Sequence, residues 1–150
     1  MARFRISIDS QLPPEQAWDR VMDLTAHDAV IPLTRIESGM VTARELTDGH
    51  RFIAWTGIGP VGFHDVMVWT RVDPPAAGKP GLAHVVKHGR AVRGDVTFTV
   101  EPGPSGGSRL VWNQRWQLPW APEIAGAITA PGARLGYRYV LGRLLARSPR

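Results

Sequence analysis

Alternating apolar and polar residues open the chain and predict a β-strand over residues 3–8. The apolar positions of that segment share one face, as in a half-buried strand: Phe4, Ile6 and Ile8. Beyond residue 13 the apolar positions recur every three or four residues, which predicts a short amphipathic helix over 14–24. A proline and an acid stand where a first helical turn accepts them. A second short helix is predicted over 26–31, ended by Pro32.

The middle of the chain alternates between strand-like runs and turn residues. Glycine and proline, 16 and 13 of the 150 residues, gather between these runs, as is typical of turns. The predicted strands are 33–41, 51–56, 62–72, 81–88, 91–101 and 108–118. Because the connections between successive strands are short, the pattern favours an antiparallel sheet.

The last two of these strands have a clear buried face. In 91–101, apolar residues and one glycine alternate with polar and charged ones. In 108–118 the predicted buried set is Leu110, Trp112, Gln114, Trp116 and Leu118. Gln114 is therefore a polar amide in an otherwise apolar row.

After Pro122 the chain predicts a helix that continues to near Arg147, with a break or kink at Pro131-Gly132. Its second half, 132–147, is apolar around most of the helix circumference. In a globular protein such a helix packs on more than one side.

This order of elements predicts an α+β fold. An antiparallel curved β-sheet of about seven strands wraps around the long C-terminal helix, and two short helices follow the first strand. One domain over residues 1–150 suits the chain length. Because a curved sheet around a single helix is difficult to fill in its middle, we expect an internal ligand cavity.

The formal net charge of +5 comes from the C-terminal segment. Before residue 124, 13 basic and 13 acidic residues cancel, and five arginines and no acid follow. At about 100° per residue, Arg134 and Arg138 lie on one side of the helix, while Arg143 and Arg147 lie on the opposite side. A helix that reads a nucleic-acid groove has its cations on one face. The sequence therefore predicts no nucleic-acid partner and gives little support to membrane-surface binding.

Composition narrows the chemistry further. The chain has no cysteine, which excludes disulfides, thiol catalysis and thiolate metal sites. The N-terminal residues contain no apolar run of the kind a secretion signal needs. The charge-free stretches 52–64 and 124–133 are too short for a membrane span and contain glycine or proline. We therefore expect a cytoplasmic protein without a membrane span.

Several segments together resemble one protein family. They are Pro14-Glu-Gln-Ala-Trp18-Asp, Gly57-Ile-Gly-Pro-Val-Gly-Phe63-His-Asp65-Val-Met67, Val86-Lys-His-Gly-Arg-Ala-Val-Arg-Gly94, Leu110-Val-Trp112-Asn-Gln114 and Leu141-Gly-Arg-Leu-Leu-Ala-Arg. In residues and order they resemble the polyketide cyclase/dehydrase and lipid-transport branch of the START-like superfamily, also called SRPBCC. The resemblance implies a helix-grip fold with a deep hydrophobic cavity, in a superfamily that ranges from lipid carriers to aromatase/cyclases.

One position departs from this resemblance. Small bacterial relatives often carry Glu two residues after the strand tryptophan, where this chain has Gln114. An amide can orient a carbonyl or hydroxyl group, but it cannot shuttle protons. The departure lowers the support for an enzymatic function.

Candidate ligand-binding residues lie on the predicted inward faces: Trp69, Met67, Phe98, Trp112, Gln114, Trp116 and Tyr139. Core packing is the alternative role for the aromatic residues, and a buried, hydrogen-bonded amide is the alternative for Gln114. Tyr137 and Tyr139 lie on different sides of the helix, so at most one of them is expected to reach a cavity.

Asp65 and His84 are the candidates for acid–base chemistry. Placing the bulkier face of strand 62–72 inward brings Asp65 to the cavity edge, either as an ion-paired structural acid or as a ligand anchor or base. His84 and His88 share a strand face, but about 13 Å separates such positions, which is too far for one metal ion. Since no cofactor-binding motif occurs either, we expect neither a metal nor a cofactor.

The sequence favours binding or transport of a small hydrophobic ligand, lipid-like or polycyclic, in an internal cavity. The alternative is a polyketide cyclase, aromatase or dehydrase with Asp65 or His84 as general base. A third interpretation is an interaction domain with a collapsed cavity that docks through an apolar strip of the long helix. A homodimer is among the partners that the sequence allows.

Overall fold

The computed structural model describes residues 1–31 and 33–146. Within them, seven strands pair side by side in one sheet, and every neighbouring pair is antiparallel. The strands are β1 (Ala2–Ser10), β2 (Thr34–Ser38), β3 (Arg51–Ile58), β4 (Val61–Asp73), β5 (Gly81–His88), β6 (Arg93–Pro102) and β7 (Ser108–Gln117). Their order is β1-β7-β6-β5-β4-β3-β2, so the first strand pairs with the last.

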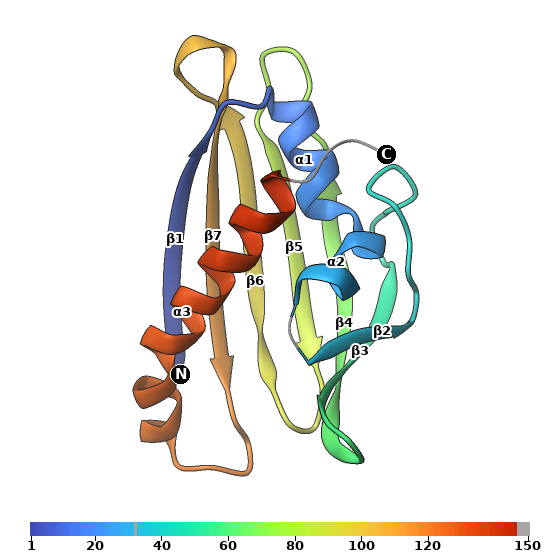
Figure 1. The fold of residues 1–150 in the computed structure, drawn as a ribbon, viewed down its shortest axis with the longest axis vertical. Helices are drawn as coiled ribbons and strands as arrows, with labels where there is room; N and C mark the ends of the chain where they lie inside the picture. The colour runs from blue at the N-terminus through green and yellow to red at the C-terminus, as the bar shows by residue number, and fades with distance from the viewer. Residues whose placement is uncertain (32, 147–150) are drawn as a thin grey trace.

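The helices lie on one face of this sheet (Figure 1). They are α1 (Pro14–Met22), α2 (Leu24–Val30) and α3 (Glu123–Ala146), and a short 3₁₀ turn, η1 (Pro104–Gly106), joins β6 to β7. Figure 1 shows α3 crossing the sheet diagonally, from the β1 side towards α1. The predicted α+β helix-grip arrangement is confirmed, including the two short helices after the first strand.

Alternation along the strands decides which side chains face the helices. In β5, Ala83, Val85 and Lys87 are buried, and the residues between them point to the opposite face. From α1, Trp18 lies over the sheet and stacks on Phe98 with 5.9 Å between ring centroids. Burying a large apolar side chain of this kind contributes about 1.5–3 kcal/mol to folding. These contacts attach α1 to the middle of the sheet.

Asp23 separates the two short helices. Its carboxylate accepts a hydrogen bond of 3.0 Å from the backbone N–H of Thr25 and so caps the N-terminus of α2. The turn changes the direction of the chain, and Met22 before it and His27 after it both reach the space under the helices.

Most predicted elements agree with the observed ones to within about two residues at each end, but two features differ more. α3 runs through Pro131 without a break. The proline removes one backbone hydrogen bond, but Ala130 and Ala133 on either side of it pack against the core and hold the helix in place. β2 ends at Ser38, before the predicted end at residue 41, because Gly39 adopts a left-handed φ of 79°.

Candidate functional site

A cavity of about 100 Å³ lies between the sheet and the three helices. Most of its wall is apolar, from Val21, Met22, Ile31, Ile36, Phe52, Ala54, Met67, Val85, Val96, Val140, Leu141 and Leu144. Three aromatic residues, Trp69, Trp112 and Tyr137, complete the apolar surface. Such a wall, with few polar groups, is typical of a small-molecule site.

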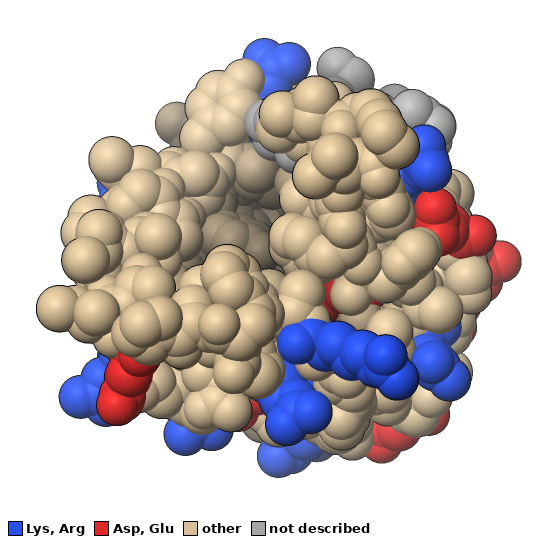
Figure 2. Space-filling view, turned by 90° about the horizontal axis from the view of Figure 1, so that it is seen from below, with Lys and Arg blue, Asp and Glu red and all other residues tan. Residues whose placement is uncertain are grey.

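A groove of about 540 Å³ adjoins the cavity, because Ile31 and Thr34 line both. Leu33, Trp55 and Tyr139 also line this groove. Figure 2 views the molecule from the lower end of Figure 1 and shows a hollow surrounded by residues other than Lys, Arg, Asp and Glu. A ligand can therefore extend from the cavity towards the surface through this groove, whose lining is mostly uncharged but includes Arg35.

An ion pair between Lys87 and Asp65 lies in the cavity wall. Lys87 Nζ donates a hydrogen bond to Asp65 Oδ2 and lies 3.4 Å from the sulfur of Met67. The two charged side chains are only 5% and 12% exposed. Burial acts to lower the pKa of Lys87, but nearby Tyr137 and Asp65 act more strongly in the other direction, so the net shift is upward. Lys87 is therefore an ammonium group at neutral pH.

Two polar atoms in the cavity wall lack hydrogen-bond partners within the described part of the chain. They are the second carboxylate oxygen of Asp65, Oδ1, and the indole nitrogen of Trp69, Nε1, and both are buried. Each buried, unsatisfied polar group costs about 1–3 kcal/mol. A molecule that offers a donor to Asp65 or an acceptor to Trp69 would recover part of that cost.

Other polar groups of the wall already have partners. The hydroxyl groups of Thr34 and Thr56 lie 2.9 Å apart, and His27 Nε2 lies 2.8 Å from the carbonyl oxygen of Val21. The ring of Tyr137 stacks on Trp112 with 5.6 Å between centroids. The polar groups open to a ligand are therefore Asp65 and Lys87, with the Trp69 indole N–H and the Tyr137 hydroxyl at other places in the wall.

Four of the candidates from the sequence line the cavity together: Asp65, Met67, Trp69 and Trp112. The first three lie on the bulkier face of β4, which faces the helices as predicted, although Phe63 and Arg71 at its ends are exposed. A register shift between Trp69 and Arg71 ends the alternation there.

Three other candidates are buried next to the cavity but do not line it. Phe98 is enclosed between Trp18 and Trp112, with 5.9 Å between centroids in each pair. Trp116 packs edge-on against Phe4. Gln114 accepts a hydrogen bond of 3.1 Å from the indole N–H of Trp112. Gln114 thus orients an aromatic residue of the wall, and Phe98 and Trp116 are core residues.

Tyr139 lies outside the cavity, and Tyr137 takes the inward position instead. Tyr139 is 59% exposed and borders the adjoining groove. The two residues are about 200° apart around the helix, and the buried stripe of Val140, Leu141 and Leu144 lies on the side of Tyr137. The prediction that Tyr139 lines the cavity was therefore wrong, because Tyr139 lies on the opposite side of the helix from Tyr137.

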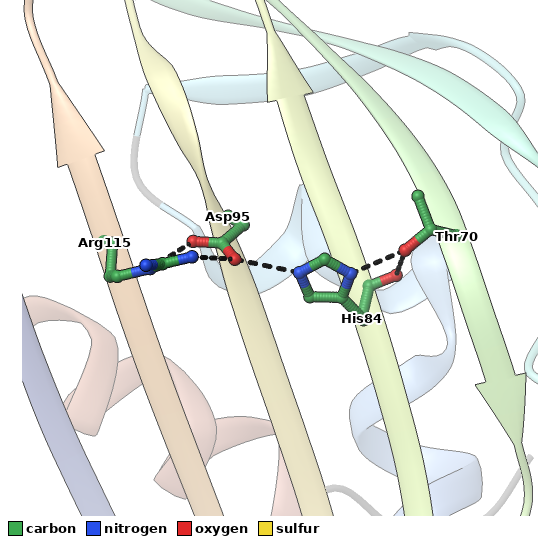
Figure 3. Close-up of polar contacts among 4 residues, drawn as sticks. All are labelled: Thr70, His84, Asp95 and Arg115. Carbon is green, nitrogen blue, oxygen red and sulfur yellow. Dashed lines mark hydrogen bonds and ion pairs between the residues drawn. The ribbon is translucent and has the colours of Figure 1, made fainter.

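His84 lies on the outer face of the sheet, which corrects its assignment as a candidate base in the cavity. Figure 3 shows it in a row of side chains that crosses four strands, from Arg115 through Asp95 and His84 to Thr70. His84 Nε2 lies 2.9 Å from Asp95 Oδ2, and His84 Nδ1 lies 2.6 Å from the Thr70 hydroxyl. Strand parity explains the position, because Ala83 and Val85 on either side of His84 face the core.

This outer row gives a pH-dependent prediction. The pKa of Asp95 falls from 3.8 to about 2. The hydrogen bond from the Arg115 guanidinium lowers it most, partial burial acts in the opposite direction, and the hydrogen bond with the His84 ring lowers it further. The folded protein thus favours the ionised form of Asp95. The stability that this carboxylate contributes is present above about pH 4 and is lost as the pH falls towards 2. Asp95→Asn should lower the free energy of unfolding by about 1–2 kcal/mol at pH 7, since exposure of Arg115 weakens the pair.

Chemical denaturation of wild type and Asp95→Asn between pH 7 and pH 2 measures this effect. The difference between the two proteins should shrink below pH 4. A difference that stays constant down to pH 2 would show that the carboxylate charge does not contribute.

Lys87 is the site residue that sequence reasoning missed. A lysine is seldom buried, so its place in β5 suggested a solvated residue. The alternation of side chains along β5 could have indicated its burial, because Lys87 shares a strand face with Ala83 and Val85, whereas the histidines of β5 occupy the other face. The ion pair with Asp65 on the neighbouring strand is what makes its burial tolerable.

Other surfaces offer less to a ligand or a metal. A depression of about 650 Å³ on the outer face is lined by exposed groups such as Arg51, His64, His88 and Arg90. Among the described residues, no three His, Asp or Glu side chains gather closely enough to hold a metal ion. Within the same residues, no helix combines the length and the hydropathy that crossing a bilayer requires.

Comparison with known proteins supports the fold. No protein-family model and no curated protein sequence matches the chain. Among solved structures, Ara h 8.0201 has 12% identity and a TM-score of 0.64, with 97% of this chain and 98% of that chain covered. Protein MLL2253 from Mesorhizobium loti has 19% identity and a TM-score of 0.63, with 99% of both chains covered.

DynU16, from the dynemicin biosynthetic locus, has 17% identity and a TM-score of 0.61. The alignment covers 97% of this chain but only 47% of that chain. At these identities the likenesses show a shared helix-grip fold and carry no statement about function.

Proposed function

We propose that the protein binds one molecule of a small, neutral and mostly apolar ligand, whose polar group is held at Asp65 and Lys87. The observation that carries this proposal is a buried ion pair with one unpartnered carboxylate oxygen, set in an otherwise apolar cavity wall. The resemblance of the sequence to the lipid-transport and polyketide cyclase branch of SRPBCC proteins supports a small-molecule ligand, as does the fold neighbour from a biosynthetic locus.

The size of the cavity favours a ligand with one ring and a short chain. A dry apolar cavity of about 150 Å³ accepts benzene. The cavity, with about 100 Å³, has comparable room, and the adjoining groove gives space for a substituent. A large lipid-like or polycyclic ligand would require α2 and α3 to move away from the sheet.

The charges of the wall favour a neutral ligand. Lys87 and Asp65 already balance each other in a region where an unpaired charge is expensive. A ligand carboxylate that paired with Lys87 would leave the charge of Asp65 uncompensated. A ligand hydroxyl group can instead donate to Asp65 Oδ1 while the ion pair stays intact.

Three probes on one scaffold test this proposal: 4-butylphenol, 4-butylanisole and 4-butylbenzoate. Binding is followed by tryptophan fluorescence, because Trp69 and Trp112 lie in the cavity wall. The phenol should bind at one site per chain. Its affinity should be about tenfold higher than that of the methyl ether, which cannot donate a hydrogen bond to Asp65. The carboxylate should bind more weakly than the methyl ether.

A cavity-filling variant shows whether the probe enters the cavity. Ala54→Phe places a ring in the cavity wall and should reduce phenol affinity at least about tenfold. The matched control is Ala127→Phe, which adds the same ring on an exposed position of α3 and should bind as wild type does. If Ala54→Phe fails to fold, Thr56→Phe fills the same wall from a less buried position. Equal binding by the filled and control variants, or no binding by wild type, would refute the proposal.

A further inference from the structure

A row of apolar side chains runs along the solvent side of α3. Its members are Ile124, Ile128, Leu135 and Tyr139, which are between 59% and 71% exposed. We call these four residues the outer stripe. From the first to the last, the outer stripe extends over about 22 Å of helix. Single exposed apolar residues are common on protein surfaces, but four large ones on the same side of one helix suggest a binding surface.

The outer stripe cannot turn into the core, because the other side of α3 is already packed. Val140, Leu141 and Leu144 are buried there, and Tyr137 reaches the cavity. This side of α3 therefore faces the protein, and the outer stripe stays in contact with solvent.

Arginines border the outer stripe on both sides. At about 100° per residue the four apolar side chains fall within about 60° of the helix circumference. Arg138 and then Arg134 follow on one border, and Arg143 lies on the other. All three are exposed, and none forms an ion pair within the described residues. Arg134 Nε donates a hydrogen bond of 3.0 Å to the carbonyl oxygen of Arg5, which leaves the rest of its guanidinium group open. After Glu123 the helix contains no acidic residue.

The charges beside the outer stripe indicate which kind of partner could cover it, a second copy of the chain or an anionic lipid surface. A second copy of the chain, laid against it helix to helix, would bring arginines close to arginines, and Glu123, the one carboxylate of each α3, already pairs with the N-terminal ammonium group. An anionic lipid surface offers the complementary charge along both borders and an apolar interior for the middle. Long arginine side chains reach headgroups from such positions while their aliphatic parts stay near the acyl chains.

We infer that α3 docks on anionic lipid membranes through the outer stripe, with Arg134, Arg138 and Arg143 contacting lipid headgroups. In the sequence, arginines on opposite sides of the helix gave little support to membrane binding. The structure instead shows an apolar centre with cations at both borders.

Co-sedimentation with vesicles tests this inference on the full chain. Wild type should bind vesicles made of equal amounts of phosphatidylcholine and phosphatidylglycerol, and should not bind phosphatidylcholine alone. Leu135→Gln should reduce the partition coefficient about tenfold, and Arg138→Gln about fivefold. Higher salt should weaken binding in the same direction as the arginine variant.

Two exposed residues on the loop between β2 and β3 supply matched controls. Met40→Gln and Arg44→Gln remove an apolar and a basic side chain outside the outer stripe and should bind vesicles as wild type does. Four results would overturn the inference: no binding by wild type, equal binding to neutral vesicles, equal losses in the control variants, or a dimer in sedimentation that Leu135→Gln abolishes. Because these variants leave the cavity intact, the phenol titration stays informative whichever result is obtained.

Discussion

Replacing Lys87 by methionine should lower the free energy of unfolding by about 3–5 kcal/mol at neutral pH. Methionine keeps a long side chain but removes the ammonium group that balances Asp65. Since Asp65 is 9% exposed, its carboxylate would then be charged, buried and without a partner. Breaking a buried ion pair from one side costs more than the pair itself contributes. Urea denaturation of the purified variant at pH 7 measures the loss.

Two further measurements identify the cause of this loss. The double variant Lys87→Met with Asp65→Asn removes both charges and should recover most of the lost stability. The deficit of the single variant should also shrink as the pH falls, because a neutral carboxyl group is cheaper to bury than a charged one. A double variant as unstable as Lys87→Met would instead mean that lost packing explains the effect.

Gly94→Ala should cost at least about 3 kcal/mol, because the position has neither the backbone conformation nor the space for a side chain. Gly94 has a φ of 149°, and a Cβ there would lie 1.9 Å from the carbonyl oxygen of Arg115. That neighbour is backbone of β7, so it cannot rotate away. Gly94 is also the cross-strand partner of Lys87, which places the distortion next to the ion pair.

Gly49→Ala is the matched control for this substitution. Gly49 has a φ of 86°, and nothing lies within 4 Å of a Cβ built on it. The control should lose only the cost of the left-handed backbone, about 1–2 kcal/mol. Thermal unfolding of the two variants distinguishes the cost of the backbone conformation, which both share, from the cost of the steric clash with β7, which only the Gly94 variant has. Equal losses at the two positions would mean that the close contact with β7 relaxes easily.

The spacing of apolar residues along the chain was sufficient to predict the fold. Alternation over 3–8 and 91–101, and helical spacing over 14–24, each follow from burying one face of a regular element. Those patterns depend only on neighbours along the chain. Of the break or kink predicted at Pro131, the break does not occur, because packing of α3 against the sheet outweighs one lost backbone hydrogen bond.

The site was predictable only in part, since it depends on pairs of strands as well as on single strands. Asp65, Met67, Trp69 and Trp112 were identified from strand faces. Lys87 was not, because its burial is explained only by Asp65 on the neighbouring strand. His84 was misplaced because its strand was considered without the buried face of Ala83 and Val85. The enzymatic alternative now depends on Asp65 alone among the candidate bases.

A crystal structure of the protein with 4-butylphenol bound would locate the ligand and its hydroxyl group. We expect one probe molecule in the cavity, with its ring near Trp69 and Trp112 and its hydroxyl group within hydrogen-bond distance of Asp65. The Lys87–Asp65 ion pair should remain intact beside it. A probe bound only on the outer face of the sheet, or an empty cavity at saturating probe, would contradict the account.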